Sequence, residues 1–541
     1  MLYPTLSMIL LLALSIAGLS VAAQRLHAAT PILMLGAGIV ASFLPGLPAV
    51  ALDPEFVLLV TLPPLLYASG VGMSWRGFHS NLRPILLLAV GCVLFTASGV
   101  AAAVHYLFAM PWAVGFVLGA IVAPPDAVAP MAIARRLGLP RRLITVLEGE
   151  SLVNDATALV LFSFSLGAMS TGDFSLTDAA LRFMAIVAGE IAYGIIVGWT
   201  MLRLRHLAFD PRAEVLLALA TPFIAFWPPH GLGGSGVVAC VAAGLWVSWN
   251  GRRLIRSATR LQGFFVWDLV TWVVEALVFL LTGLQARIVI GALASNGLAH
   301  ALAVGLVISA TVIVVRFAWV FPATYLPRLI PAVRLRDPYP DWRLPFLVGF
   351  TGLRGVVSLA AALSIPSALN GEPFPQRDTV LFATFILIVI TLAGLGALMP
   401  LVIRWLGLSR TGAAEAAANK HDERAVRLEG IDAALATLNR VEAAGALASV
   451  VDALRRQYND RQHHLAVTAD EAVADDPVAA GSALQLQLIE IERQVIGHAY
   501  EENRLTDEAR RRIEREIDLE EARVRHALAS AGPADGGDPG S

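Results

Sequence analysis

Apolar residues dominate the first three-quarters of the chain, where they gather into runs of about twenty residues. At about 1.5 Å per residue, a helix of that length crosses about 30 Å of hydrocarbon. The pattern therefore predicts thirteen membrane-spanning helices. They cover residues 4–23, 31–48, 55–73, 84–105, 111–134, 150–169, 181–202, 213–228, 232–249, 264–284, 297–320, 345–367 and 379–403.

The arginines between these runs support the number of spans and predict the orientation of the chain in the membrane. Odd-numbered connections carry eighteen arginines, whereas even-numbered connections carry only three, Arg182, Arg287 and Arg377. Because cytoplasmic connections hold the excess of positive charge, the alternation predicts an N-terminus outside the cell and a cytoplasmic C-terminus. The eighteen are Arg25, Arg76, Arg83, Arg135, Arg136, Arg141, Arg142, Arg203, Arg205, Arg212, Arg252, Arg253, Arg256, Arg260, Arg328, Arg334, Arg336 and Arg343.

Composition changes near residue 410. The 541-residue chain is 57% hydrophobic and 15% charged, but its last part is rich in Ala, Glu and Arg. We predict a transmembrane domain over residues 1–405, a cytoplasmic helical tail over 411–530 and a disordered C-terminus over 531–541. The net charge of −2 gives no indication of nucleic-acid binding, and the two cysteines lie in apolar runs, which argues against a disulfide framework or a cysteine metal site.

The run at 150–169 contains the polar sequence "GESLVNDATALVLF". Glu150, Ser151, Asn154 and Asp155 stand at i, i+1, i+4 and i+5, so they form two adjacent columns on one helical face. An ionisable group at membrane depth costs at least ~3 kcal/mol, so such groups point away from lipid and mark functional sites. A face with two carboxylates is expected to attract cations or protons.

Two predicted spans are interrupted. "IVAPPDAVAP" places Pro124, Pro125 and Asp126 inside the span at 111–134, and "GFTGLRGVVSLA" places three glycines around Arg354 in the span at 345–367. The two lie seven spans apart, which is an odd offset, so the chain is expected to contain inverted repeats. Paired discontinuous helices of this kind are typical of a transporter site near the bilayer midplane.

The remaining charges within the predicted spans need partners or a structural role. An unpaired arginine is implausible in this setting, so we expect Arg354 to pair with Glu150 and to leave Asp126 and Asp155 without a counter-ion. Taken singly, Glu190, Asp268 and Glu275 are more typical of structural groups between helices. Asp268 and Glu275 are seven residues apart and share a helical face.

Several of these motifs together resemble the sodium/proton exchanger family of monovalent cation–proton antiporters, in its bacterial Asn-Asp type. They are "PDAVAP", "ESLVND", Arg316, "GLRGVVS" and "PGLPAVALDPEFVLLVTLPPLLYASG" (residues 45–70), which fall on the expected spans in the expected order. The resemblance covers about residues 1–405.

The resemblance implies an all-α integral membrane fold with thirteen transmembrane helices, two broken and crossing helices, and a homodimer in the cell membrane. Its ion site maps to Asp126, Asn154 and Asp155, with Ser151 as a further oxygen ligand. The family's buried ion pair maps to Glu150 and Arg354, and Arg316 and Glu275 are expected to modulate the site. The chain has Pro125 where relatives offer a threonine and Ala68 where many have an acid, so backbone carbonyls are expected to contribute ligands.

The expected function is exchange of Na⁺ for H⁺ by alternating access, serving sodium transport and pH homeostasis without a cofactor. Two buried acids with amide and hydroxyl oxygens suit a hard monovalent cation, and their mutual repulsion lets a proton compete for the same site. Asn154 in place of a second aspartate predicts electroneutral one-for-one exchange. K⁺ or Li⁺ in place of Na⁺, and a Na⁺-coupled symporter of a small organic anion, stay open as alternatives.

An enzyme is the remaining class to consider. "GGSG" at residues 233–236 carries a serine, but an intramembrane serine protease also needs a histidine base on a neighbouring span, and His230 lies in the same loop-to-span region. "GES" at residues 149–151 lacks the second glycine of a nucleophile elbow. We therefore expect no enzymatic activity.

Overall fold

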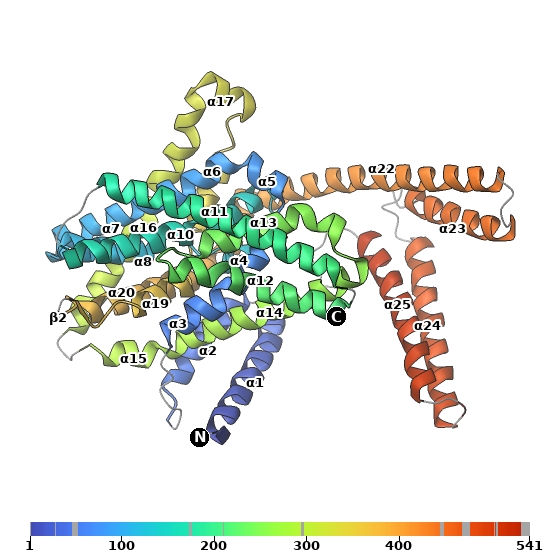
Figure 1. Cartoon of the computed structure of the whole chain (residues 1–541), viewed down its shortest axis with the longest axis horizontal. Helices are drawn as coiled ribbons and strands as arrows, with labels where there is room; N and C mark the ends of the chain where they lie inside the picture. The colour runs from blue at the N-terminus through green and yellow to red at the C-terminus, as the bar shows by residue number, and fades with distance from the viewer. Residues whose placement is uncertain are drawn as a thin grey trace. The chain divides into compact units, whose positions relative to one another are not determined.

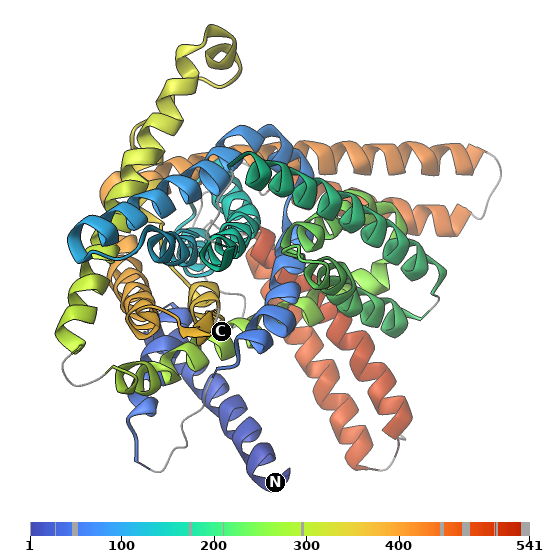
Figure 2. The same cartoon turned by 60° about the vertical axis from the view of Figure 1, so that its left-hand side comes forward.

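The structure, a computed structural model, describes residues 2–26, 29–45, 52–171, 176–208, 210–293, 297–369, 371–443, 448–467, 477–502, 504 and 507–531. Most of these residues are helical, and the described strands form one antiparallel pair, β1 (Ala368–Leu369) with β2 (Glu372–Pro373). The chain divides into two compact units, Met1–Ser409 and Arg410–Ser541. Both are drawn from two directions in Figures 1 and 2.

The first unit is a bundle of apolar helices, and each apolar run predicted from the sequence overlaps helical residues in it. Its helices are α1 (Leu2–Leu26), α2 (Thr30–Ser42), α3 (Pro54–Phe56), η1 (Val57–Thr61), α4 (Leu62–Gly72), α5 (Trp75–Ser80), α6 (Leu82–Leu86), η2 (Leu87–Cys92), α7 (Val93–Phe108), α8 (Trp112–Val122), α9 (Val128–Arg136), α10 (Arg141–Thr171), α11 (Leu176–Leu207), α12 (Pro211–Gly231), α13 (Val237–Leu254), α14 (Ser257–Leu284), α15 (Ala286–Gly291), α16 (Leu298–Tyr325), η3 (Leu326–Leu329), α17 (Pro331–Arg336), α18 (Arg343–Phe350), α19 (Val356–Leu363), α20 (Arg377–Val389), η4 (Ile390–Leu395) and α21 (Gly396–Leu406).

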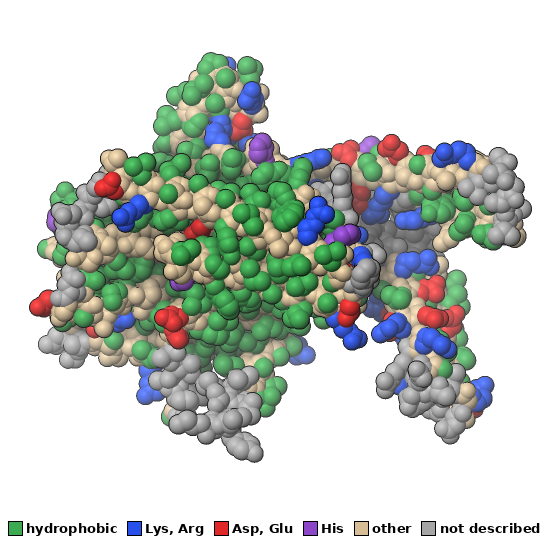
Figure 3. Space-filling view, viewed as in Figure 1, with side chains coloured by type: hydrophobic (Ala, Val, Ile, Leu, Met, Phe, Trp, Pro, Cys, Tyr) green, Lys and Arg blue, Asp and Glu red, His purple; other side chains and the backbone are tan. Residues whose placement is uncertain are grey.

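Seven helical stretches within the described residues are each long and apolar enough to cross a membrane. They are Pro54–Gly72, Leu82–Phe108, Arg141–Ser170, Thr177–Leu207, Thr259–Gly291, Leu298–Leu329 and Arg377–Leu406. Shorter apolar helices accompany them, and hydrophobic side chains cover much of the face shown in Figure 3. The first unit is therefore a multi-pass helical membrane domain, and the number of thirteen crossings stays a prediction.

Small residues let the helices beside the site pack closely. Gly38 of α2 and Gly283 of α14 face each other, and a Cβ on Gly38 would overlap the carbonyl of Leu280. Such small residues allow two backbones to approach within a membrane, where dispersion contacts drive packing. The close contact fixes α14, which also carries Glu275, against α2.

Among the residues that the structure describes, three spans contain a π-helical turn: η1, η2 and η4. A π-turn breaks the regular hydrogen-bond ladder and is frequent at functional sites. Thr61 ends η1 and lines the main cavity, while the Thr391 hydroxyl in η4 accepts a hydrogen bond from the backbone N–H of Arg354, at 3.1 Å. Two of the three π-turns thus lie beside the site described next.

The second unit consists of polar helices: α22 (Leu408–Ala443, which starts at the end of the first unit), α23 (Ala448–Val467), α24 (Pro477–Glu501) and α25 (Asp507–Ala531). A small apolar core of Ile489, Ile517 and Val524 joins α24 to α25. Arg493 of α24 also bonds to Asp518 of α25, at 3.0 Å. Residues 532–541, most of the segment predicted to be disordered, lie outside the described residues.

Candidate ion-binding site

The first interrupted span separates into α8 and α9, with residues 123–127 between them outside regular helix. Pro124 and Pro125 have no backbone N–H and cannot continue the helical ladder, which explains the break. Asp126 is held within it: its backbone N–H donates to the Leu353 carbonyl at 2.7 Å, and its carboxylate accepts from the Val128 N–H at 2.9 Å. The acid therefore sits at the start of α9, where helix N–H groups favour negative charge.

The second interrupted span separates into α18 and α19, with residues 351–355 between them. Gly355 lies directly against the first break, because a Cβ added there would overlap the carboxylate of Asp126. Together with the Asp126–Leu353 hydrogen bond, this contact joins the two breaks. The sequence correctly predicted both interruptions, and the glycine-rich one supplies room for the aspartate of the other.

Arg354 stabilises the broken end of α8. Its Nε donates to the Val122 carbonyl at 2.9 Å and its Nη2 donates to the Ala123 carbonyl at 3.1 Å. These carbonyls lie at the C-terminal end of a helix, where they lack helical partners and carry partial negative charge. A cation is therefore satisfied there without an ion pair.

The predicted pairing of Glu150 with Arg354 is wrong. Glu150 of α10 instead forms two hydrogen bonds with Arg316 of α16, at 2.6 and 2.9 Å, and the two side chains are only 2% and 1% exposed. This fork-to-fork geometry is the strongest form of a charge-assisted hydrogen bond. Arg354 needs no acid as a partner, because the carbonyls freed by the broken helix accept its hydrogen bonds, and such carbonyls are not apparent when charged residues alone are matched.

The rest of the polar face of α10 turns toward the break. The Asn154 side chain donates from Nδ2 to the Pro125 carbonyl at 2.7 Å, while its Oδ1 is buried and has no hydrogen-bond partner among the described residues. Asp155, one residue further on, is buried and lines the main cavity, as does Ser151. Within the described residues, the Asp155 carboxylate has no ion-pair partner.

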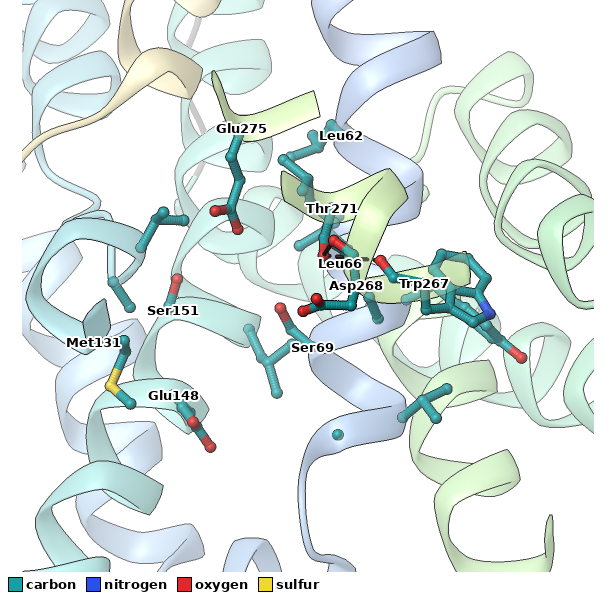
Figure 4. A pocket seen from close by; sticks show the side chains of 18 of the residues that line it. Leu62, Leu66, Ser69, Met131, Glu148, Ser151, Trp267, Asp268, Thr271 and Glu275 are labelled. Atoms are coloured by element: carbon teal, nitrogen blue, oxygen red, sulfur yellow. Dashed lines mark hydrogen bonds between the residues drawn. The ribbon is translucent and has the colours of Figure 1, made fainter. Parts of the chain in front are cut away.

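The cavity has a volume of about 720 Å³ and brings four of the predicted site residues together, whereas Asn154 does not line it. Asp126, Ser151, Asp155 and Glu275 all line it. Figure 4 shows the Glu275 carboxylate from α14 and the Ser151 hydroxyl from α10 on facing sides, with Ser69 of α4 near the middle. Polar wall residues that the sequence did not indicate include Thr61, Ser69, Glu148, Thr271 and Ser358.

Glu190 has a structural role outside this cavity. Its carboxylate accepts hydrogen bonds from the backbone N–H groups of Ser235 (2.5 Å), Gly236 (2.9 Å) and Val238 (3.1 Å) at the start of α13. A carboxylate at a helix N-terminus satisfies N–H groups that have no helical partner. The "GGSG" motif is thus the N-terminal cap of α13.

Comparison with known proteins identifies the group to which the chain belongs. The family described as sodium/hydrogen exchanger, transmembrane, matches residues 10–405. The chain belongs to the sodium/hydrogen exchanger family. This confirms the predicted family and makes the chain a multi-pass membrane protein of a transporter family, not of an enzyme family.

Individual exchangers extend the comparison. The chain is 33% identical over 519 residues to the Na⁺/H⁺ exchanger Rv2287 of Mycobacterium tuberculosis, covering 93% of each protein. It is 31% identical over 385 residues to a sodium, potassium, lithium and rubidium/H⁺ antiporter of Bacillus pumilus, covering 69% of this chain and 57% of that one. Its fold resembles the sodium proton antiporter MjNhaP1 of Methanocaldococcus jannaschii, with a TM-score of 0.60 at 18% identity over 75% of this chain and 99% of that one.

Proposed function

We propose that the protein exchanges a monovalent cation, chiefly Na⁺, for H⁺ across the cell membrane at a site formed by Asp126 and Asp155. One observation carries the proposal: both carboxylates line one cavity, and neither has an ion-pair partner among the described residues. Asp155 is buried and Asp126 is half-buried, and acids at membrane depth without partners are costly unless a cation or proton neutralises them. The nearby arginines are engaged elsewhere, Arg316 by Glu150 and Arg354 by helix carbonyls.

The donor set suits a hard monovalent cation, which prefers oxygen ligands. Asp126 and Asp155 supply carboxylate oxygens, Ser151 a hydroxyl oxygen, and Asn154 an amide oxygen that is buried without a partner. Pro125 has no hydroxyl, and its carbonyl already accepts from Asn154. We infer that the unwound backbone near Asp126 provides any further ligand.

Cation and proton would compete for the same two carboxylates. When the cation leaves, two neighbouring negative charges repel each other in a buried cavity, so a proton takes its place. The empty site would be too highly charged to cross the membrane barrier, so movement requires one ion or the other. Alternating access then converts competition into antiport, and the single uncharged amide of Asn154 keeps the exchange electroneutral, one for one.

The cavity walls support an inward-open arrangement. Arg135, Arg205 and Arg260 line the cavity, and each belongs to an arginine-rich end predicted to be cytoplasmic. We infer thirteen crossings, with α8–α9 and α18–α19 as equivalent broken spans of two inverted repeats. The N-terminus would lie outside, the tail in the cytoplasm, and two copies would form a homodimer.

K⁺ is the second cation to consider. The Bacillus pumilus relative is named for sodium, potassium, lithium and rubidium, so the family includes members with a broad cation range. This chain lacks a hydroxyl at position 125 and an acid at position 68, and a site with fewer side-chain ligands discriminates less between cations. We therefore expect Na⁺ and Li⁺ to be transported, with K⁺ as the informative comparison.

A pH-sensitive dye in proteoliposomes tests the proposal. Addition of Na⁺, Li⁺ or K⁺ alone to acid-loaded vesicles should raise the internal pH with the wild type, whereas a symporter would need an organic anion. Asp126→Asn and Asp155→Asn should abolish the signal. Asp268→Asn is the matched control, because Asp268 is an exposed acid on the same cavity wall and should tolerate the change. Wild-type exchange by Asp155→Asn would disprove the proposed site.

A further inference from the structure

The segment Leu326–Arg343 follows the long helix α16 and leads into α18. It consists of η3, α17 and the turn after them. Figures 1 and 2 both show α17 projecting from the neighbouring helices of its unit. Because it is continuous with an apolar helix long enough to span the membrane, Leu298–Leu329, it begins where that helix would leave the hydrocarbon.

The apolar side chains of this segment point outward. Leu335 is 87% exposed, and Trp342, which packs against Phe346 and Trp405, is still 48% exposed. Several exposed apolar side chains within one short segment are typical of surfaces that bind a partner or a membrane. The exposed large apolar residues are Leu326, Leu329, Ile330, Leu335, Tyr339 and Trp342.

The charges of the same segment leave an excess of arginine. Asp337 is bound by Arg142 and Arg328, both at 2.7 Å, and also by Arg83. Burial opposes its ionisation, but these hydrogen bonds and charges outweigh burial and hold the pKa of Asp337 below its ordinary value. Its negative charge is therefore already balanced within the protein.

The two arginines of α17 are left facing outward. Arg334 and Arg336 are exposed, and within the described residues neither has an ion-pair partner. Between them lies Leu335, the most exposed of the apolar residues. The projection in Figure 3 accordingly shows blue and green side chains close together.

We propose that Leu326–Arg343 lies in the headgroup layer of the membrane and binds anionic phospholipid there. Interfacial segments combine apolar residues and aromatic rings, which enter the boundary of the acyl chains, with arginines, which reach lipid phosphates. In this segment the apolar side chains are those of Leu329, Ile330 and Leu335, and the arginines are Arg334 and Arg336. The inference concerns a lipid contact separate from the ion cavity, since no residue of this segment lines the cavity.

A fluorophore on the full-length protein can show whether the segment Leu326–Arg343 lies in the membrane or in water. The native cysteines, Cys92 and Cys240, are buried, so a dye attached to Leu335→Cys labels the segment selectively. In vesicles of phosphatidylethanolamine with one-quarter phosphatidylglycerol, nitroxide-labelled lipid should quench this dye, while aqueous iodide should not. Val426→Cys on α22, an exposed apolar position of the polar unit, is the matched control and should be quenched by iodide. Equal iodide quenching at both positions would refute the interfacial location.

Lipid selectivity tests the arginines. Quenching of the Leu335→Cys dye by nitroxide phosphatidylglycerol should exceed quenching by nitroxide phosphatidylcholine, and each arginine should account for roughly a fivefold preference. Arg334→Gln with Arg336→Gln should bring the ratio close to one. The charge-matched double variant Arg512→Gln and Arg515→Gln on α25 should leave it unchanged. A wild-type ratio near one, or an equal fall in both double variants, would overturn the proposed anionic-lipid contact.

Discussion

The buried pair of Glu150 and Arg316 can be tested by removing one partner at a time. Glu150→Gln keeps the shape of the side chain but removes the charge that accepts two hydrogen bonds from Arg316. The guanidinium would retain one backbone acceptor, the Val348 carbonyl at 3.2 Å. Removing one partner of a buried pair costs about 3–5 kcal/mol, because the remaining charge is left in a low-dielectric interior.

Removing both charges should cost much less. In Glu150→Gln with Arg316→Met, neither charge is buried, and replacing a complete ion pair by neutral groups is often nearly neutral for stability. The free energy of unfolding, measured by denaturant titration in detergent, should therefore show a coupling energy of about 2–3 kcal/mol between positions 150 and 316. The corresponding cycle with Arg354→Met should give less than about 1 kcal/mol, since Arg354 bonds to carbonyls.

The comparison of the two cycles decides the assignment. A larger coupling energy between Glu150 and Arg354 than between Glu150 and Arg316 would show that the pairing predicted from the sequence is correct and that the geometry described above is not. Far-ultraviolet circular dichroism of each purified variant serves as the control, because a lost helix signal would mean that the variant no longer starts from the native fold.

Three further changes test other parts of the structure. Gly355→Ala adds a Cβ that would overlap the Asp126 carboxylate, so the rate of cation-dependent dye dequenching should fall at least about tenfold. A Cβ added at Gly394 would meet open space, so the control variant Gly394→Ala should exchange cations for protons at the wild-type rate. Asn154→Asp adds a carboxylate to the site, so exchange should become electrogenic and respond to a valinomycin-imposed voltage; no voltage response would argue against the proposed role of Asn154. Hydrogen bonds and ion pairs from arginines hold the pKa of Asp337 below its ordinary value despite its burial. At neutral pH, Asp337→Asn should therefore lower the free energy of unfolding by about 1 kcal/mol. The difference in unfolding free energy between the wild type and Asp337→Asn should be fully present above about pH 4 and should disappear as the pH falls through the lower pKa of the folded state. A difference that grows on acidification would contradict this role of Asp337.

The helical architecture and several residues that line the cavity were predictable from the sequence, because each depends on local patterns. Apolar run length indicates a span, Pro124 and Pro125 break a helix wherever they occur, and the spacing of Ser151 and Asp155 places them on one face whatever their neighbours. These properties are visible in one segment at a time.

Partner choice was not predictable in the same way. Glu150 lies 166 residues from Arg316 and would have been equally compatible with Arg354, since charge alone does not distinguish two arginines. The hydrogen bond from Asn154 to the Pro125 carbonyl and the threonine beside Arg354 depend on how unwound segments meet. A backbone carbonyl carries no mark in the sequence, so contacts of this kind emerge only from the assembled fold.

The corrected partners bear on the stoichiometry of exchange. Glu150 and Arg316 cancel each other, and Arg354 contributes one positive charge against the helix carbonyls, while Asp126 and Asp155 contribute two negative charges. Two positive charges against three negative ones leave these five side chains at −1 when all are ionised. Under the proposed function, one monovalent cation or one proton would bring these side chains to neutrality, so both forms would carry the same total charge. The sum counts position 154 as neutral, so one-for-one exchange depends on Asn154 as well as on the charge of Arg354 at the end of α8.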